Sequence, residues 1–243
     1  MISNRGGGYS KKEDTTIYRW REDLTSDSKG LFLYKNINSN NYWSATYEPC
    51  KFEGEHYKAQ FSSDKITFSR EDGNIITETH ITVSQEEDAE IRSINLKNNS
   101  NHDRVIEITS YCEVTLANYN TDLVHPSFSN LFVKTEFSEE PFCILANRRK
   151  RSEMDISPWL MQTVAVEGNQ IGGLQYETSR IDFIGRGRNL YNPRAMDNET
   201  NLKNSIGPVL DPIISIRVRV KLKSKENCTI AYTTAFVIPK KRE

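Results

Sequence analysis

Along most of this chain, hydrophobic and polar side chains alternate with a period of two, the pattern of a β-strand with one buried and one wet face. In residues 105–116, apolar side chains at alternate positions are separated by a mixed, more polar set: Glu107, Thr109, Tyr111 and Glu113. Residues 214–222 alternate in the same way, with Arg217, Arg219 and Lys221 on the polar side. The pattern therefore predicts two long strands that each turn one face toward a core.

Shorter alternating runs predict further strands at 31–35, 75–83, 91–96, 131–137, 142–147, 161–166, 174–178 and 229–237. Turn residues separate several of them, for example Gly73-Asn74 and Gly168-Asn169. No helical pattern exceeds about three turns, although a short helix is expected within 192–198, after Pro193. Many strands without intervening helices predict one all-β domain over residues 1–243, an antiparallel sandwich of two large sheets.

Composition narrows the possible partners. The chain has 243 residues with 32 basic and 33 acidic side chains, so its net charge of −1 gives no argument for binding nucleic acid. No apolar run approaches the roughly 18 residues of a membrane span, and no signal peptide is recognised, so direct membrane contact is not expected. The cysteines lack metal-like spacing, and we expect them to be reduced in a cytoplasmic protein: Cys50, Cys112, Cys143 and Cys228.

The first 21 residues contain the chemistry most typical of a binding site. Gly6, Gly7 and Gly8 allow a close backbone approach, and Tyr9 follows them directly. Arg19-Trp20-Arg21 then places two guanidinium groups around an indole ring. Flat aromatic faces and planar donors are the groups that bind sugars. The same stretch is also compatible with a surface turn followed by a strand that carries solvated charges.

Two irregular segments interrupt the alternation, and loops of this kind often hold functional residues. Residues 117–130 contain His125, which precedes a proline and should therefore project from an extended backbone. Residues 179–211 contain the run Gly185-Arg186-Gly187-Arg188, an arrangement that can bind an anion or sugar hydroxyls. Arginines in a long loop more often hold that loop by donating to backbone carbonyls.

No catalytic motif is found in the sequence. It has no G-x-S-x-G elbow, no H-E-x-x-H zinc motif and no phosphate-binding loop of the Walker type. The carboxylate pair of a glycosidase cannot be recognised from spacing, because 33 acidic residues offer too many pairs. We therefore assign no catalytic residue, no metal ligand and no cofactor from the sequence.

Several blocks of the sequence carry a family resemblance: MISNRGGGYS, YRWREDLTSDSKGLFLY, WSATYEP, HPSFSNLFVKTEF, LQYETSRIDFIGRGR and SIGPVLDPIISIR. In this order they resemble the N-terminal supersandwich domain of glycoside hydrolase family 94, formerly glycosyltransferase family 36. The likeness is strongest to the phosphorylase-like part of its cyclic β-1,2-glucan synthase members, and it covers essentially the whole chain. It implies a large supersandwich of the galactose mutarotase-like type with few or no helices.

The resemblance also implies a role. In that family the reaction takes place in a separate (α/α) barrel, so we expect this chain to be an excised domain that is not an enzyme by itself. Its expected role is that of a non-catalytic module of a β-glucan phosphorylase or synthase. It would pack on its own catalytic barrel, contribute a loop to the sugar cleft and support a homodimer. The implied substrate-binding residues are Gly7, Gly8 and Tyr9, with Arg19, Arg21 and His125 as weaker candidates, whereas Arg180, Arg186 and Arg188 are expected to hold their loop.

Two other functions remain open on the sequence. An autonomous carbohydrate-binding module for β-glucan oligosaccharides would use an exposed aromatic ring as its platform, and the candidates are Tyr9, Trp20, Trp43 and Trp159. Each tryptophan is individually more typical of a core position. A mutarotase-like enzyme would need a histidine and a carboxylate in one cleft, for which only His125 is a plausible start.

Overall fold

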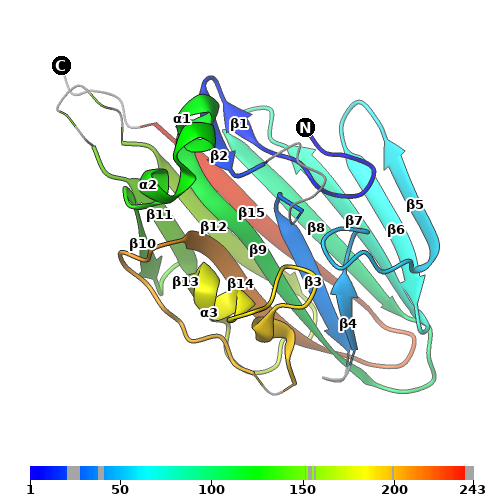
Figure 1. Cartoon of the computed structure of the whole chain (residues 1–243). Helices are drawn as coiled ribbons and strands as arrows, with labels where there is room; N and C mark the ends of the chain where they lie inside the picture. Colours follow the sequence, from blue (N-terminus) through cyan, green and yellow to red (C-terminus); the bar gives the residue numbers. More distant parts are fainter. Residues whose placement is uncertain are drawn as a thin grey trace.

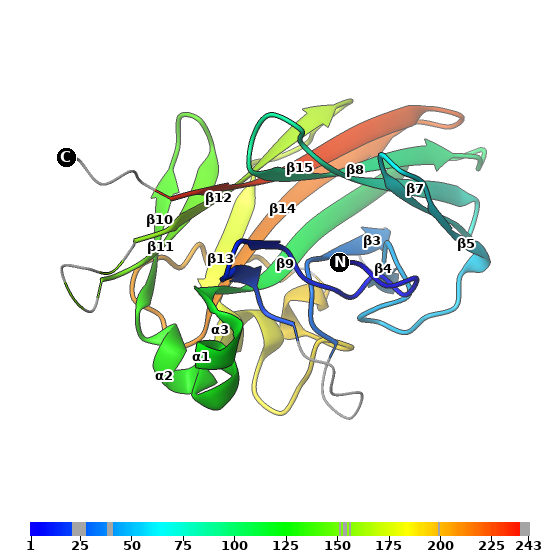
Figure 2. The ribbon, with the colours of Figure 1, turned by 90° about the horizontal axis from the view of Figure 1, so that it is seen from above.

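The alternating runs form two antiparallel β-sheets that pack face to face, as the computed structural model shows (Figures 1 and 2). The structure describes residues 1–20, 28–37, 41–150, 152, 155, 157–198 and 200–238. The prediction of an all-β sandwich with two large sheets is confirmed.

The first sheet has seven strands and is built around the 15-residue strand β9 (Arg104–Asn118). One edge of β9 pairs with β14, which pairs in turn with β13, and the other edge is shared between β2 and β3. The remaining strands of this sheet have these bounds: β1 (Lys11–Lys12), β2 (Thr15–Tyr18), β3 (Phe32–Ile37), β4 (Asn41–Ser44), β13 (Gln175–Ser179) and β14 (Pro212–Leu222).

The second sheet has eight strands in the order β10-β11-β12-β15-β8-β7-β6-β5. The last strand in the described part of the chain, β15, therefore lies in the middle of the sheet, between β12 and β8. Its strands have these bounds: β5 (Glu55–Phe61), β6 (Ile66–Asp72), β7 (Ile75–Val83), β8 (Ala89–Asn98), β10 (Val133–Ser138), β11 (Cys143–Arg148), β12 (Trp159–Glu167) and β15 (Asn227–Val237).

The main core lies between the two sheets and is formed by the apolar side of each alternating strand. Ile106 and Ile108 of β9 and Ile216 of β14 belong to the same buried cluster as Ile94 and Ile230 of the second sheet. A buried tyrosine joins the sheets directly. The Tyr232 hydroxyl donates to the backbone carbonyl of Ile108 at 3.0 Å, so its polar end is satisfied inside the core.

The outer face of the seven-stranded sheet is also buried, which corrects the prediction that β9 and β14 have one wet face. Thr109 and Tyr111 are each 1% exposed and Glu113 is 4% exposed, because residues 119–130 and 180–211 cover this side of the sheet. A second apolar cluster forms there, in which Phe183 packs on Tyr34 and Tyr111. A period of two shows which residues share a face, but it does not show what covers that face.

Among the described residues, three short α-helices lie on this covered side: α1 (Tyr119–Val124), α2 (Pro126–Asn130) and α3 (Arg180–Ile184). Asn118 caps the start of α1 by accepting from the amide of Asn120, and Ser179 caps α3 by accepting from the amide of Asp182. The helix expected within 192–198 is a single 3₁₀ turn, η1 (Arg194–Met196), which follows Pro193.

Candidate functional site

The N-terminal glycines form a tight loop that needs their lack of a side chain. The Tyr9 amide donates to the Met1 carbonyl at 2.9 Å, and the Gly8 amide donates to the Lys29 carbonyl at 3.2 Å. A Cβ on Gly8 would lie only 2.1 Å from the Met1 carbonyl oxygen, and Gly6 has a φ of +93°, which L side chains rarely adopt. The loop therefore fixes the position of Tyr9 through its backbone.

Gly8→Ala is expected to lower the free energy of unfolding by about 1–3 kcal/mol, because the methyl group cannot fit beside the Met1 carbonyl without moving the backbone. Gly173→Ala is the matched control, since none of the described atoms lies within 4 Å of a Cβ built there and its φ is not in the left-handed region. Urea unfolding of both variants tests this, and equal stabilities would show that the loop adapts freely.

Tyr9 and Trp20, two of the predicted aromatic platforms, lie together. Their ring centroids are 5.4 Å apart at an interplanar angle of 50°, and both rings line a cavity of about 380 Å³ beside Tyr119 of α1. The other candidates lie elsewhere: Trp43 stacks on Phe52 in the region of β4, and Trp159 is the first residue of β12.

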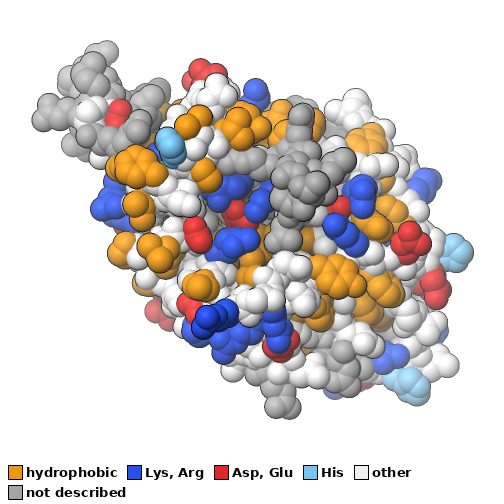
Figure 3. Space-filling model, viewed as in Figure 1, with side chains coloured by type: hydrophobic (Ala, Val, Ile, Leu, Met, Phe, Trp, Pro, Cys, Tyr) orange, Lys and Arg blue, Asp and Glu red, His pale blue; other side chains and the backbone are white. Residues whose placement is uncertain are grey.

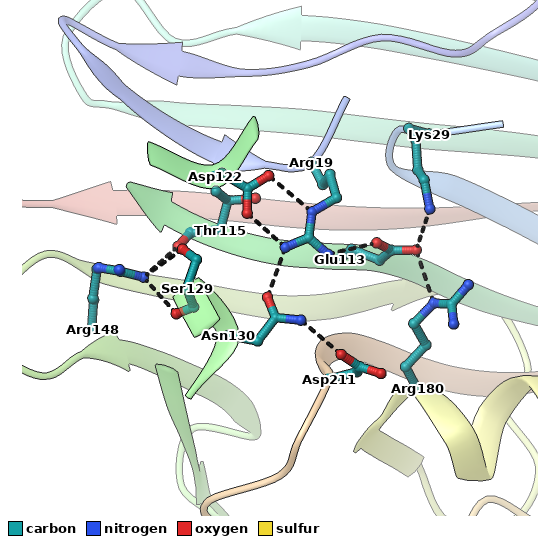
Figure 4. A network of polar contacts seen from close by, with 10 residues as sticks. All are labelled: Arg19, Lys29, Glu113, Thr115, Asp122, Ser129, Asn130, Arg148, Arg180 and Asp211. Carbon is teal, nitrogen blue, oxygen red and sulfur yellow. Dashed lines mark hydrogen bonds and ion pairs between the residues drawn. The ribbon is translucent and has the colours of Figure 1, made fainter. Parts of the chain in front are cut away.

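Arg19 does not line that cavity but is buried in a network of polar groups (Figure 4). Its Nη1 donates to Glu113 at 2.9 Å, Nε and Nη2 donate to Asp122 at 3.0 and 2.7 Å, and Nη2 also donates to Asn130 at 2.7 Å. These contacts use most of the guanidinium donors. Arg19 thus joins β9, α1 and α2, and sugar binding by this residue stays a prediction.

Glu113 is the centre of the network. Its Oε1 accepts from Lys29, Arg180 and Tyr111, each at 3.0 Å, and its Oε2 accepts from Arg19. Burial alone would raise the pKa of this carboxyl, but the positive charges of Lys29, Arg19 and Arg180 outweigh it and lower the pKa to about 2. Glu113 is therefore ionised at neutral pH and is unsuited to the role of a general acid.

The network fixes the three helices to the sheet. Asp122 comes from α1, Asn130 from the end of α2 and Arg180 from the start of α3, and all of them converge on β9 (Figure 4). Asn130 also donates to Asp211 at 2.7 Å, which holds the segment that leads into β14. Helices this short have little stability of their own, so these buried contacts keep them in place.

The remaining predicted residues are separate from one another. His125 is exposed and links α1 to α2, with the φ of −141° that its position before proline favours. Arg188 pairs with Asp197 inside its own loop at 2.5 Å. Arg186 is exposed, and Arg21 lies outside the described residues.

Exposed apolar side chains gather on the surface formed by α1, α2, α3 and the segment 206–210, which we call the helical face (Figure 3). Val124 is 65% exposed, Phe128 56%, Ile181 69% and Leu210 78%. Isolated exposed apolar residues are ordinary, whereas a gathered set marks an interaction surface. The large apolar side chains exposed on the helical face are Tyr119, Leu123, Val124, Phe128, Leu131, Ile181, Ile206 and Leu210.

The residues that organise this region could not be found by sequence reasoning. Glu113 and Asp122 lie 94 and 103 residues from Arg19, so no local spacing connects them. The alternation predicts a wet face for Arg217, but this residue is 3% exposed and donates to the Thr200 carbonyl at 2.6 Å, which anchors the long loop. The hint that the sequence does carry for these residues is that charged side chains such as Glu113 and Arg217 occupy alternate positions of strands that also contain tyrosine and isoleucine.

Within the part of the chain that the structure describes, no group of three or more His, Cys, Asp or Glu side chains could hold a metal ion. None of the helices described is long and apolar enough to cross a membrane. All four cysteines are free and buried.

Comparison with known proteins agrees with this architecture. Residues 1–243 match the family model described as glycosyl hydrolase 94, supersandwich domain. The chain is 34% identical over 235 residues to cyclic beta-(1,2)-glucan synthase NdvB of Rhizobium meliloti (strain 1021). This match covers 96% of this chain and 8% of that protein. The chain is 22% identical over 204 residues to N,N'-diacetylchitobiose phosphorylase of Vibrio furnissii, covering 82% of this chain and 24% of that protein.

Among solved structures, a bacterial glucoamylase complexed with acarbose has a similar fold. The TM-score is 0.53 at 9% sequence identity, and the match covers 91% of this chain and 27% of the glucoamylase. At this identity the likeness concerns the fold alone. In the matches to NdvB, the phosphorylase and the glucoamylase, this chain spans only a small part of the length of the other protein.

Proposed function

Because the chain belongs to glycosyl hydrolase 94 as its supersandwich domain, we propose that it is a non-catalytic module whose helical face packs on the catalytic part of a β-glucan-acting enzyme. The observation that carries the proposal is the set of exposed apolar side chains on the helical face, including Phe128, Ile181 and Leu210. Burying these side chains against a partner would remove an apolar surface that is unfavourable in water.

The rigid support of this face favours a permanent contact. The short helices are held by buried charges around Glu113 and Arg19, so little conformational entropy remains to be lost when a partner binds. The catalytic part of the same enzyme is the natural occupant, because the relatives carry this domain as 8% and 24% of their length.

The N-terminal loop would lie at the border of that contact. Tyr119 of α1 lines the same cavity as Tyr9, so the loop adjoins the helical face. In the proposed assembly, Gly7, Gly8 and Tyr9 contribute to the edge of the sugar cleft and to a contact between two subunits. His125, exposed between α1 and α2, would face the catalytic part. In this proposal the reaction itself takes place in the catalytic part of the enzyme.

Phe128→Asp in the longer enzyme is expected to weaken the contact between the domains by at least about tenfold, because it places a charge in an apolar interface. The result would be a lower thermal stability of the whole enzyme and faster release of the domain by limited proteolysis. The variant of the 243-residue chain alone should unfold within a few degrees of the parent, since Phe128 is 56% exposed.

Phe61→Asp is the matched control. Phe61 is 52% exposed, but it lies in β5 at the far edge of the other sheet. If both substitutions affect the longer enzyme equally, or if neither does, the helical face is not the site of packing.

A further inference from the structure

We propose that a small cavity between α1 and the ends of β9 and β11 is an anion-binding site, which holds a tetrahedral oxyanion, sulfate or a phosphate group, between Arg148 and Arg149. The cavity measures about 190 Å³. One water molecule takes about 30 Å³ of liquid, so the cavity has room for a small ion with a few waters. It is smaller than the roughly 300 Å³ at which sites for larger ligands begin. The site goes beyond the packing role, which requires no ligand on this chain.

The end of β11 brings the two arginines together. Neighbouring side chains of a regular strand point to opposite faces of the sheet. Arg148 is the last residue of β11, however, and both it and Arg149 line the same cavity. Their backbone is fixed, because the Arg148 amide donates to the Pro158 carbonyl at 3.2 Å and the Arg149 amide donates to the Phe132 carbonyl at 2.8 Å. The adjacency of the two charges is therefore built into the backbone.

Arg148 is the rigid member of the pair. It is 8% exposed, and its Nη1 donates to the Ser129 carbonyl at 3.0 Å and to the Ser129 hydroxyl at 3.2 Å (Figure 4). Its guanidinium also lies over the Phe132 ring, 5.4 Å from the centroid. A guanidinium held in this way loses little conformational entropy when an anion binds, and its planar set of donors matches the oxygens of an oxyanion.

Arg149 supplies the second charge from the solvent side. It is exposed, and its Nη2 donates to the Leu131 carbonyl at 2.5 Å. Asp155 is the one acidic side chain in the described part of the lining, and its Oδ2 accepts from the Ser152 amide at 3.2 Å. Two guanidinium groups against one carboxylate leave one positive charge in excess. An anion is therefore favoured over a cation or a neutral ligand.

The end of β9 forms another wall of the cavity. Leu116 has a φ of +49°, a conformation that is uncommon for a residue other than glycine, and it is 1% exposed. Three consecutive residues, 116–118, line the cavity there, whereas a straight strand would turn every second one away. Thr15 and Thr121 add hydroxyls that can donate to an oxyanion. Backbone strain of this kind is frequent at ligand sites.

The test is a calorimetric titration of the 243-residue chain with sodium sulfate, at an ionic strength kept constant with sodium chloride. We expect a dissociation constant of about 1 mM, as a few charge-assisted hydrogen bonds in a partly open site would give. Arg149→Gln should weaken sulfate binding by roughly tenfold, because it removes one of the two charges. Thr121→Val should weaken it by about twofold to threefold, because it removes one hydroxyl donor.

Arg186→Gln is the matched control, since Arg186 is also an exposed arginine but does not line the cavity. The absence of heat at about 20 mM sulfate would overturn the inference, and so would equal weakening by Arg149→Gln and Arg186→Gln, which would indicate screening of surface charge. Methyl phosphate is titrated in parallel. Binding of both ions supports a phosphate group carried by a larger molecule, and binding of sulfate alone supports a site for the free ion.

Discussion

Glu113→Gln is expected to lower the free energy of unfolding at pH 7 by about 3–5 kcal/mol, because three cations lose the buried carboxylate that neutralises them. Lys29, Arg19 and Arg180 all contact this group, and the Glu113 side chain is only 4% exposed. Glutamine has the same shape but no charge, and its amide group would bring N–H donors toward the cations. The cost is therefore one of electrostatics and not of packing.

The effect should depend on pH in a defined direction. The pKa of Glu113 is about 2 in the folded chain against 4.5 for an unperturbed glutamate, a difference that corresponds to about 3 kcal/mol. Because the folded pKa is the lower one, this stabilisation is present above pH 4.5 and is lost as the pH falls toward 2. Urea unfolding at pH 7 and pH 3 should show the difference between wild type and Glu113→Gln becoming smaller.

The control for this prediction is Glu136→Gln. Glu136 also accepts from a lysine, Lys134 at 2.7 Å, but both side chains are at least 40% exposed. An exposed pair of this kind contributes at most about 1 kcal/mol. If Glu136→Gln costs as much as Glu113→Gln, or if the Glu113→Gln deficit is the same at pH 3 as at pH 7, the buried network does not have the stabilising role assigned to it.

Phe183→Ala is expected to destabilise the chain by about 3–5 kcal/mol, the usual cost of removing a large aromatic side chain from a closed core. Phe183 is fully buried, and its ring lies 4.9 Å from that of Tyr111 and 5.9 Å from that of Tyr34. It is one of the contacts that pack α3 on the outer side of the seven-stranded sheet. Its loss should also increase amide hydrogen exchange in residues 180–198 more than in β12 or β15.

Ile181→Ala, on the same helix, distinguishes the loss of core packing from a change in the stability of the helix itself. Ile181 is 69% exposed, so its truncation should change the free energy of unfolding by no more than about 0.5 kcal/mol. In the longer enzyme, however, Ile181→Ala removes part of the helical face. A large destabilisation of the isolated chain by Ile181→Ala would contradict the assignment of Phe183 to the core and Ile181 to the interface.

The alternating pattern is sufficient to predict the strands that cross the main core. Residues 75–83 form β7 as predicted, and 105–116 and 214–222 lie within β9 and β14. The short and irregular strands escape prediction because their patterns are weak. Strand β5, for example, has no fully buried residue, and its pairing with β6 includes a register shift.

The candidate site is harder to predict, for a physical reason. Tyr9 and Trp20 can be recognised because their residue types alone suggest sugar binding, but Tyr119, which lines the same cavity, comes from a helix about 100 residues further along the chain. Arg19 is next to Trp20 in the sequence, yet its side chain meets Glu113 and Asp122 instead. Such long-range ion pairs follow from the sheet order, which a single sequence does not encode locally.

The central position of β15 has a consequence for how the chain acquires its structure. Strands β5–β8 and β10–β12 can each form a set of hairpins early, yet their facing edges, β8 and β12, stay unpaired until residues 227–237 are available. During synthesis the larger sheet therefore remains in two halves until residues 227–237 have emerged. Such late, non-local closure favours slow folding, and the two open edges are where an incomplete chain would aggregate.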